Sequence, residues 1–144
     1  MNGNCKWFLS ACLAGAVLTL ATPAYSEEQH VVAQGEWTKK AYSIEGTWKL
    51  VERDDKYYIV LDENFKTKKA PDLKVFLSPL PLDELTGNNA TSGSLFVGAL
   101  RSNQGAQELT VPTDAKLDRY VTVIIQCEKY SKLWGGASLA SKGN

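Results

Sequence analysis

The sequence predicts an all-β domain, an antiparallel β-sandwich with a jelly-roll-like arrangement of about seven or eight strands. Three observations predict it. Short runs alternate between apolar and polar residues, as strands with one buried face do. Clusters of Gly, Pro, Asn, Asp and Ser separate these runs and predict turns. No stretch carries the longer apolar period of an amphipathic helix. A closed barrel is the alternative architecture.

Residues 1–26 are typical of a secretory signal peptide. Lys6 supplies the positive charge, residues 8–20 form the apolar run, and Ala24-Tyr25-Ser26 presents small residues for cleavage after Ser26. The apolar run is shorter than the ~20 residues that span a membrane. An alternative is a lipoprotein, since residues 9–12 resemble a lipobox that ends at Cys12, but most of the apolar run follows this cysteine. We therefore expect a periplasmic or secreted protein without a membrane span.

The mature chain, residues 27–144, has the size of one ordinary domain. The whole chain carries 16 basic and 16 acidic residues, and the predicted signal peptide removes one basic residue and no acid. No basic patch or Lys/Arg stripe stands out, so we do not expect a nucleic-acid partner. The sequence leaves the oligomeric state open.

Residues 27–40 are polar and weakly periodic, and they predict an N-terminal arm that packs through Trp37. The arm holds the only histidine of the chain, His30. The sandwich domain is expected to follow over residues 41–140.

The domain is expected to begin with a hairpin. Residues 41–52 alternate as a half-buried strand, with Val51 as the exception, and Gly46 within it predicts a bulge or a close backbone contact. The charged residues 53–56 predict the turn, and residues 57–61 predict the returning strand.

The middle of the domain contains a long loop. Residues 72–77 and 95–100 predict strands, and the Pro- and Gly-containing segment between them, residues 78–94, is too long for a simple turn. We expect this loop to cross from one sheet to the other, with one helical turn over residues 81–85.

Three further elements are expected on either side of the strand over residues 120–128. Residues 102–105 predict a hairpin loop that leads into a strand over residues 107–111. Residues 113–119 predict a short connector. Residues 133–139 predict a Gly-rich last strand.

The strongest strand signal in the chain lies at residues 120–128. Alternate residues of this strand are apolar and share one face, so that face should be buried: Val121, Val123, Ile125 and Cys127. Cys127 is therefore expected at the end of a core strand, on its inward face.

Composition excludes several kinds of active site. Cys5 and Cys12 belong to the predicted signal peptide, so Cys127 is the single thiol of the mature chain and no internal disulfide can form. One cysteine and one histidine, with His30 in the arm, are too few for a zinc site, a blue-copper site or a Ser-His-Asp triad. We expect no metal site built by several ligands and no stand-alone enzyme activity.

The chemistry left open centres on Cys127. It is a candidate redox thiol that exchanges with the disulfide of a redox partner protein. It is also a candidate ligand to haem iron or another metal ion, although the sequence requires no cofactor. The third reading is an inert, buried side chain, because free cysteine is among the most buried residue types.

A set of short motifs lies along the chain from about Tyr42 to Leu139, and their order and spacing are informative together. Together they resemble the DM-thirteen domain, also called the electron-transfer DM domain, a proposed relative of the DOMON β-sandwich. The motifs are Gly46, Phe65, Pro71-Asp72-Leu73, Leu77-Ser78, Gly98 with Leu100, Gly105 with Gln107, Val111-Pro112, Ile125-Gln126-Cys127, and Gly136-Ala137 with Leu139.

The resemblance implies a cysteine that acts in electron transfer, either as a bare thiol or bound to haem or a metal, and Cys127 matches its position. The chain departs from the family at Gln126, where a tryptophan is common, and at Leu109, where an aromatic residue is common. We expect a periplasmic or secreted domain with an electron-transfer or thiol-redox role centred on Cys127. The alternative is a non-catalytic extracytoplasmic binding module with a structural cysteine.

Overall fold

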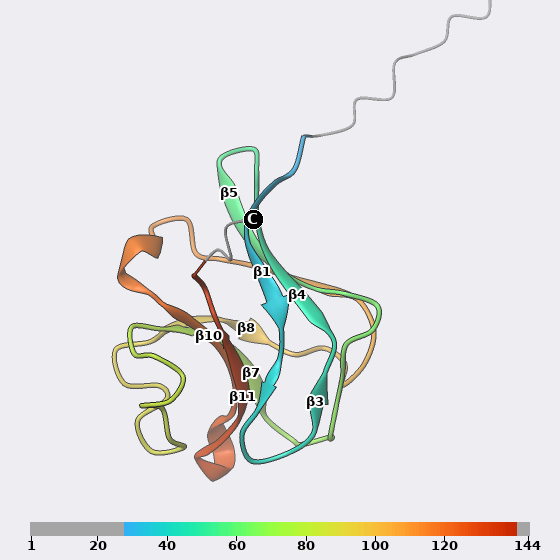
Figure 1. Cartoon of the computed structure of the whole chain (residues 1–144), viewed down its shortest axis with the longest axis vertical. Helices are drawn as coiled ribbons and strands as arrows, with labels where there is room; N and C mark the ends of the chain where they lie inside the picture. The colour runs from blue at the N-terminus through green and yellow to red at the C-terminus, as the bar shows by residue number, and fades with distance from the viewer. Residues whose placement is uncertain (1–27, 141–144) are drawn as a thin grey trace, which may run out of the picture.

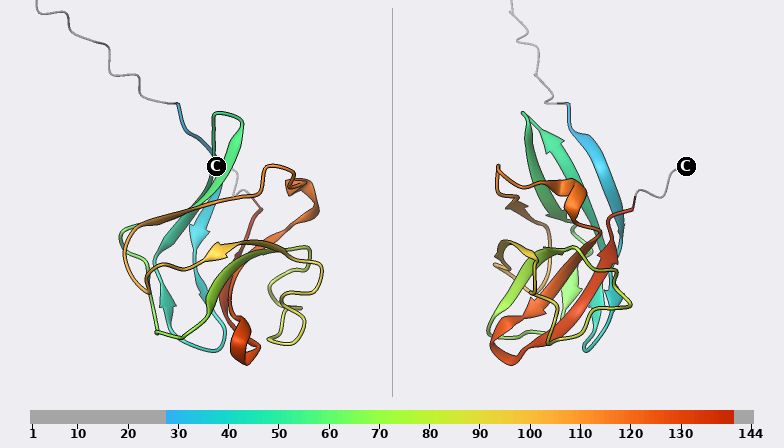
Figure 2. Two further views of the ribbon diagram at one scale, coloured as in Figure 1. Left: turned by 180° about the vertical axis from the view of Figure 1, so that it is seen from behind. Right: turned by 90° about the vertical axis from the view of Figure 1, so that its left-hand side faces the viewer.

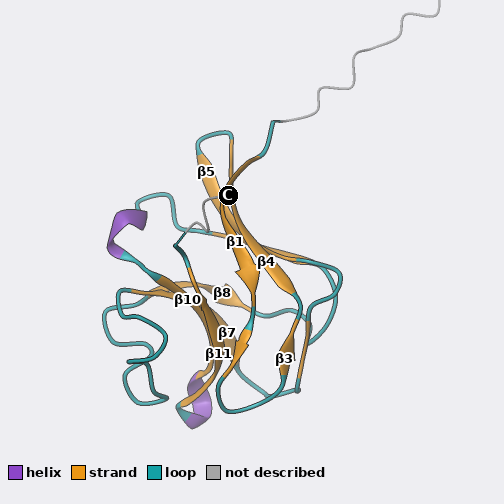
Figure 3. Cartoon of the chain, viewed as in Figure 1, coloured by secondary structure: helices purple, strands orange, loops and turns teal. Residues whose placement is uncertain are grey.

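The structure is a computed structural model that describes residues 28–140. The predicted signal peptide, its cleavage point after Ser26 and the alternative lipid site Cys12 lie outside the described residues. Within them the fold is all-β, with antiparallel strands and two single-turn helices, η1 (Leu117–Arg119) and η2 (Glu128–Tyr130) (Figure 3). The predicted fold class is confirmed.

The described residues contain eleven strands, three of which have only two residues each. The remaining eight agree with the predicted number. The strands are β1 (His30–Glu36), β2 (Thr38–Lys39), β3 (Ile44–Glu45), β4 (Thr47–Arg53), β5 (Lys56–Leu61), β6 (Lys66–Thr67), β7 (Leu73–Ser78), β8 (Leu95–Ala99), β9 (Gln107–Thr110), β10 (Thr122–Cys127) and β11 (Lys132–Ser138).

Two sheets form the layers of the sandwich (Figures 1 and 2). The first sheet has the order β1-β4-β5-β9, and the second has the order β2-β11-β10-β7-β8. The short strands β3 and β6 pair separately. In the second sheet β10 lies at the centre, with β11 and β7 on either side.

The predicted N-terminal arm is part of both sheets. β1 pairs with β4 in the first sheet, and β2 pairs with β11 in the second, so one run of chain supplies an edge strand to each layer. The sequence pattern did not show these two strands, because the run changes sheets between β1 and β2, which interrupts the alternation that identifies a strand. Its predicted anchor is confirmed: Trp37 is buried, with ring centroids 6.1 Å from Trp48 and 6.2 Å from Phe65.

Gly46 divides the strand predicted over residues 41–52 into β3 and β4. Its φ is +100°, and a Cβ at this position would lie 2.6 Å from the carbonyl oxygen of Asn64. The hairpin that follows is confirmed, because β4 pairs with β5 in register. Its turn residues Asp54 and Asp55 both have positive φ, as a two-residue hairpin turn of the tight type requires.

Two predicted connections were wrong. β7 and β8 are neighbours in one sheet, so residues 79–94 do not cross between sheets. They fold over the outer face of the second sheet, and we call this segment the covering loop. Residues 100–106 were predicted to contain a hairpin loop, but β8 and β9 belong to different sheets, so here the chain does cross.

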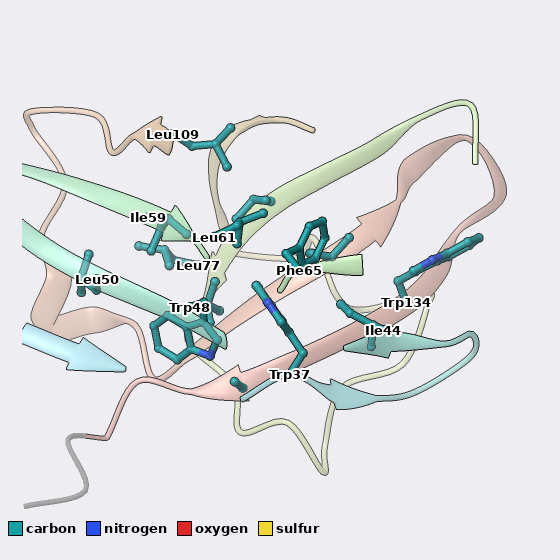
Figure 4. Packing of buried hydrophobic residues seen from close by; sticks show 14 of the residues in the cluster. Trp37, Ile44, Trp48, Leu50, Ile59, Leu61, Phe65, Leu77, Leu109 and Trp134 are labelled. Atoms are coloured by element: carbon teal, nitrogen blue, oxygen red, sulfur yellow. The ribbon is translucent and has the colours of Figure 1, made fainter. Parts of the chain in front are cut away.

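The main core fills the space between the two sheets (Figure 4). Three tryptophans from different elements pack in it, and the indole nitrogens of all three are buried without a hydrogen-bond partner within the described residues: Trp37, Trp48 and Trp134. A second, smaller core lies beneath the covering loop, where Leu85 and Ala90 contact Phe76 and Ile124. β10 is therefore buried on both faces.

Substitution of Gly46 tests the close approach that separates β3 from β4. We expect Gly46→Ala to lower the free energy of unfolding by ~3 kcal/mol or more, because positive φ and the contact with the Asn64 carbonyl both oppose a Cβ. Gly105→Ala is the matched control, since Gly105 has φ +83° with no atom within 4 Å of the added Cβ. It should cost only ~1 kcal/mol. Equal losses in urea unfolding would show that the contact at Gly46 carries no cost.

Candidate functional site

Cys127 is the last residue of β10, and its register partners are Leu73 on β7 and Lys132 on β11. Its exposed fraction is 0%, and it is a free thiol in the main core. It shares the inward face of β10 with Val123 and Ile125, as predicted. Val121 does not belong to this face. It is 42% exposed and lies outside the strand, because β10 begins at Thr122.

Cys127 is the last buried residue before an exposed segment of the chain. All six residues of β10 are buried, and the next five residues, 128–132, are all exposed. Leu73, opposite Cys127, is likewise the first buried residue of β7. Cys127 therefore belongs to the terminal layer of the second sheet, where strand ends open at a lower free-energy cost than strand centres.

Hydrogen bonds and ion pairs join the residues that follow β10 to Asp72, which precedes β7. The Glu128 N–H donates to the Asp72 carbonyl at 3.2 Å, and the Lys129 N–H donates to the Asp72 carboxylate at 3.1 Å. The Lys74 ammonium lies 3.2 Å from the Asp72 carboxylate and also pairs with the Glu128 carboxylate. The hydrogen bond to Glu128, followed by that to Asp72, raises the pKa of Lys74 above its ordinary value. We call Asp72, Lys74 and Glu128 the ionic clamp.

The opposite side of the same turn is held by the covering loop. The Gln126 side chain is 1% exposed, and its Nε2 donates to the Gly87 carbonyl at 2.9 Å. Its Oε1 is buried and has no hydrogen-bond partner within the described residues. Gly87 approaches Ser131 so closely that a Cβ on Gly87 would lie 2.0 Å from the Ser131 carbonyl oxygen.

The described residues do not fit a haem or a multi-ligand metal at Cys127. Its sulfur is enclosed by core side chains, which leaves no open coordination position. A groove of about 340 Å³ opens beside Asp72 and Leu73, but Cys127 is not among the residues that line it. Residues 28–140 contain no cluster of three His, Cys, Asp or Glu side chains suited to a metal. His30 is exposed beside Glu52 at the start of β1, at the end of the sandwich opposite to η2 (Figure 1).

A family model described as electron transfer DM13 matches residues 36–139. The chain belongs to the DM13 family. The match begins at the last residue of β1 and continues through β11, so it includes every later strand of both sheets and Cys127. The family suggests an electron-transfer role for this DM13 domain. No curated protein and no solved structure matches the chain. No helix in the part of the chain that the structure describes could cross a membrane.

Sequence reasoning placed Cys127 on the inward face of its strand but missed the groups around it. The ionic clamp joins segments that are distant in sequence, since its pair of Lys74 with Glu128 spans 54 positions. Gly87 lies in the covering loop, which was predicted to leave this sheet. The sequence signal that could have identified the clamp is a charged residue next to each strand end: Asp72 directly before β7 and Glu128 directly after β10.

Replacement of the thiol by Ala or Ser tests its packing. We expect Cys127→Ala to lower the free energy of unfolding by ~1 kcal/mol through the small cavity it leaves. Cys127→Ser should cost ~2 kcal/mol, because the hydroxyl is more costly to bury in an apolar core than the thiol. Urea unfolding of the two variants checks this order. A Ser variant as stable as the parent would contradict burial of the side chain.

Proposed function

We propose that this DM13 protein is an electron-transfer domain that acts in the periplasm or outside the cell, with Cys127 as its redox-active thiol. The observation that carries the proposal is the match to the electron-transfer family, which spans the sandwich and contains a single cysteine. The signal-like segment over residues 1–26 supports the location. The enclosed sulfur favours a bare thiol over a haem or metal ligand.

A single thiol can pass two electrons between a donor protein with a dithiol and an acceptor protein with a disulfide. The Cys127 thiolate attacks the acceptor disulfide, forms a mixed disulfide and releases one acceptor thiolate. A donor thiolate then attacks the Cys127 sulfur, and the second acceptor sulfur leaves as a thiolate. The second donor thiolate closes the donor disulfide and releases Cys127 unchanged. The donor has lost two electrons and the acceptor has gained them.

Complete burial of Cys127 favours the second candidate function, a non-catalytic extracytoplasmic binding module with a structural cysteine. The two candidates differ in whether the sulfur reacts while the domain is folded. Thiol–disulfide exchange requires contact between the attacking and attacked sulfurs, so the end of β10 must open. A structural cysteine requires no such opening and no exchange with a disulfide.

The decisive experiment uses the reduced mature protein and glutathione disulfide as the probe. We expect one glutathione adduct at Cys127, detected by mass, at a rate above that set by global unfolding, and no adduct in Cys127→Ala. A dithiol protein added afterwards should remove the adduct and become oxidised. An adduct that forms only in unfolding concentrations of urea would support the binding module instead.

A visible absorption spectrum of protein exported to the periplasm, recorded with and without dithionite, tests the cofactor. We expect no Soret band, because the enclosed sulfur offers haem iron no open position. A dithionite-sensitive Soret band that is absent from Cys127→Ala would overturn the bare-thiol proposal and make Cys127 a haem ligand.

A further inference from the structure

The segment after Cys127 is exposed and is held on its two sides by contacts of different kinds. It comprises η2 and the start of β11, residues 128–132, and we call it the flap. Every residue of the flap is exposed, and none belongs to either core. Burial of apolar surface therefore does little to hold it closed, and its position depends on the polar and packing contacts at its edges.

The ionic clamp holds one edge of the flap. It anchors the first two flap residues to Asp72, through two backbone N–H groups and through Lys74, which pairs with carboxylates on both segments. The clamp is partly solvated: the side chains of Lys74, Asp72 and Glu128 are 26%, 31% and 50% exposed. Salt therefore screens it, and its strength is that of a surface ion-pair network.

The covering loop holds the other edge. Gly87 packs against Ser131 and Lys132 at a distance that no side chain could occupy. Ser131 has a left-handed backbone (φ 49°, ψ 47°), which is unfavourable for a residue with a Cβ. Opening at Ser131 would relieve this conformation, which makes it a suitable hinge. Figure 1 shows η2 at the end of β10 and β11, away from the centre of the sandwich.

We propose that the flap opens as a unit about Ser131 while the sandwich stays folded, and that this opening gives a partner disulfide access to Cys127. The flap is the only exposed segment that follows Cys127 directly in the described chain. Release of the clamp frees Glu128 and Lys129 from Asp72, which removes the backbone contacts beside the Leu73–Cys127 pair. The terminal pair of the sheet can then separate without disturbing Val123 or Ile125.

The proposal that opening serves a partner rests on the proposed exchange role of Cys127. The opening itself does not, because any small alkylating reagent can report it. The flap is therefore tested by alkylation and the exchange role by glutathione disulfide. A flap that opens without a glutathione adduct refutes only the exchange role, and a flap that fails the comparison of Lys74→Met with Lys49→Met leaves the exchange role standing.

The experiment measures the rate at which iodoacetamide alkylates Cys127 in the reduced mature protein, over a series of urea concentrations below the unfolding transition. Local opening exposes little surface and has a shallow urea dependence, whereas global unfolding has a steep one. We expect a shallow dependence. Added sodium chloride should raise the rate in the parent, because it screens the ionic clamp.

Three variants separate the flap from general stability. Lys74→Met removes the ammonium that joins Asp72 to Glu128 but leaves the two backbone bonds to Asp72, so it should raise the rate about threefold and reduce its dependence on salt. Gly87→Ala displaces the covering loop from the flap and should raise the rate about tenfold. Lys49→Met is the matched control, since Lys49 forms a similar pair with Asp62 at 3.0 Å in the other sheet. Its rate below the transition should equal that of the parent.

A urea dependence in the parent equal to that of global unfolding would overturn the flap. Equal acceleration by Lys49→Met and Lys74→Met would also overturn it, because general loss of stability would then explain both. Should Gly87→Ala fail to fold, the Lys74→Met and control pair decides alone. A flap that opens as expected without a glutathione adduct would instead refute the exchange role.

Discussion

The structure depends on the burial of β10 on both faces. Its inward side chains need the first sheet, and its outward side chains, led by Ile124, need the covering loop. The polar residues of the strand must then find partners inside the protein. Thr122 donates to the Leu80 carbonyl at 2.8 Å, and Gln126 donates to Gly87. These two bonds fix the covering loop at both ends of the strand and make it part of the core.

Alternation along the chain predicted the strands and their faces, because the side-chain period of a strand is local. The strand over residues 57–61 and the inward face of Cys127 followed from it directly. Alternation does not say which sheet a strand joins, so the covering loop and the connection at residues 100–106 were assigned the wrong way round. Gly46 was correctly singled out, but the break it causes depends on Asn64, which approaches only in the folded chain.

The candidate site likewise has features that the local sequence predicts and features that arise only in the folded chain. The residue type and position of Cys127 could be identified from composition and from the family motifs. Its surroundings could not, because the clamp and the Gly87 contact join segments that are distant in sequence. Gln126 illustrates the difference: it appeared as a departure from the family pattern, and it is the side chain that ties the central strand to the covering loop.

The pairing of β2 with β11 joins the first and the last parts of the domain. During synthesis the β2 residues leave the ribosome first and the β11 residues last, so the second sheet cannot be completed until almost the whole chain has emerged. β10, the centre of both cores, also lies late in the sequence. Burial of β10, and with it the completion of both cores, therefore depends on residues that are translated last.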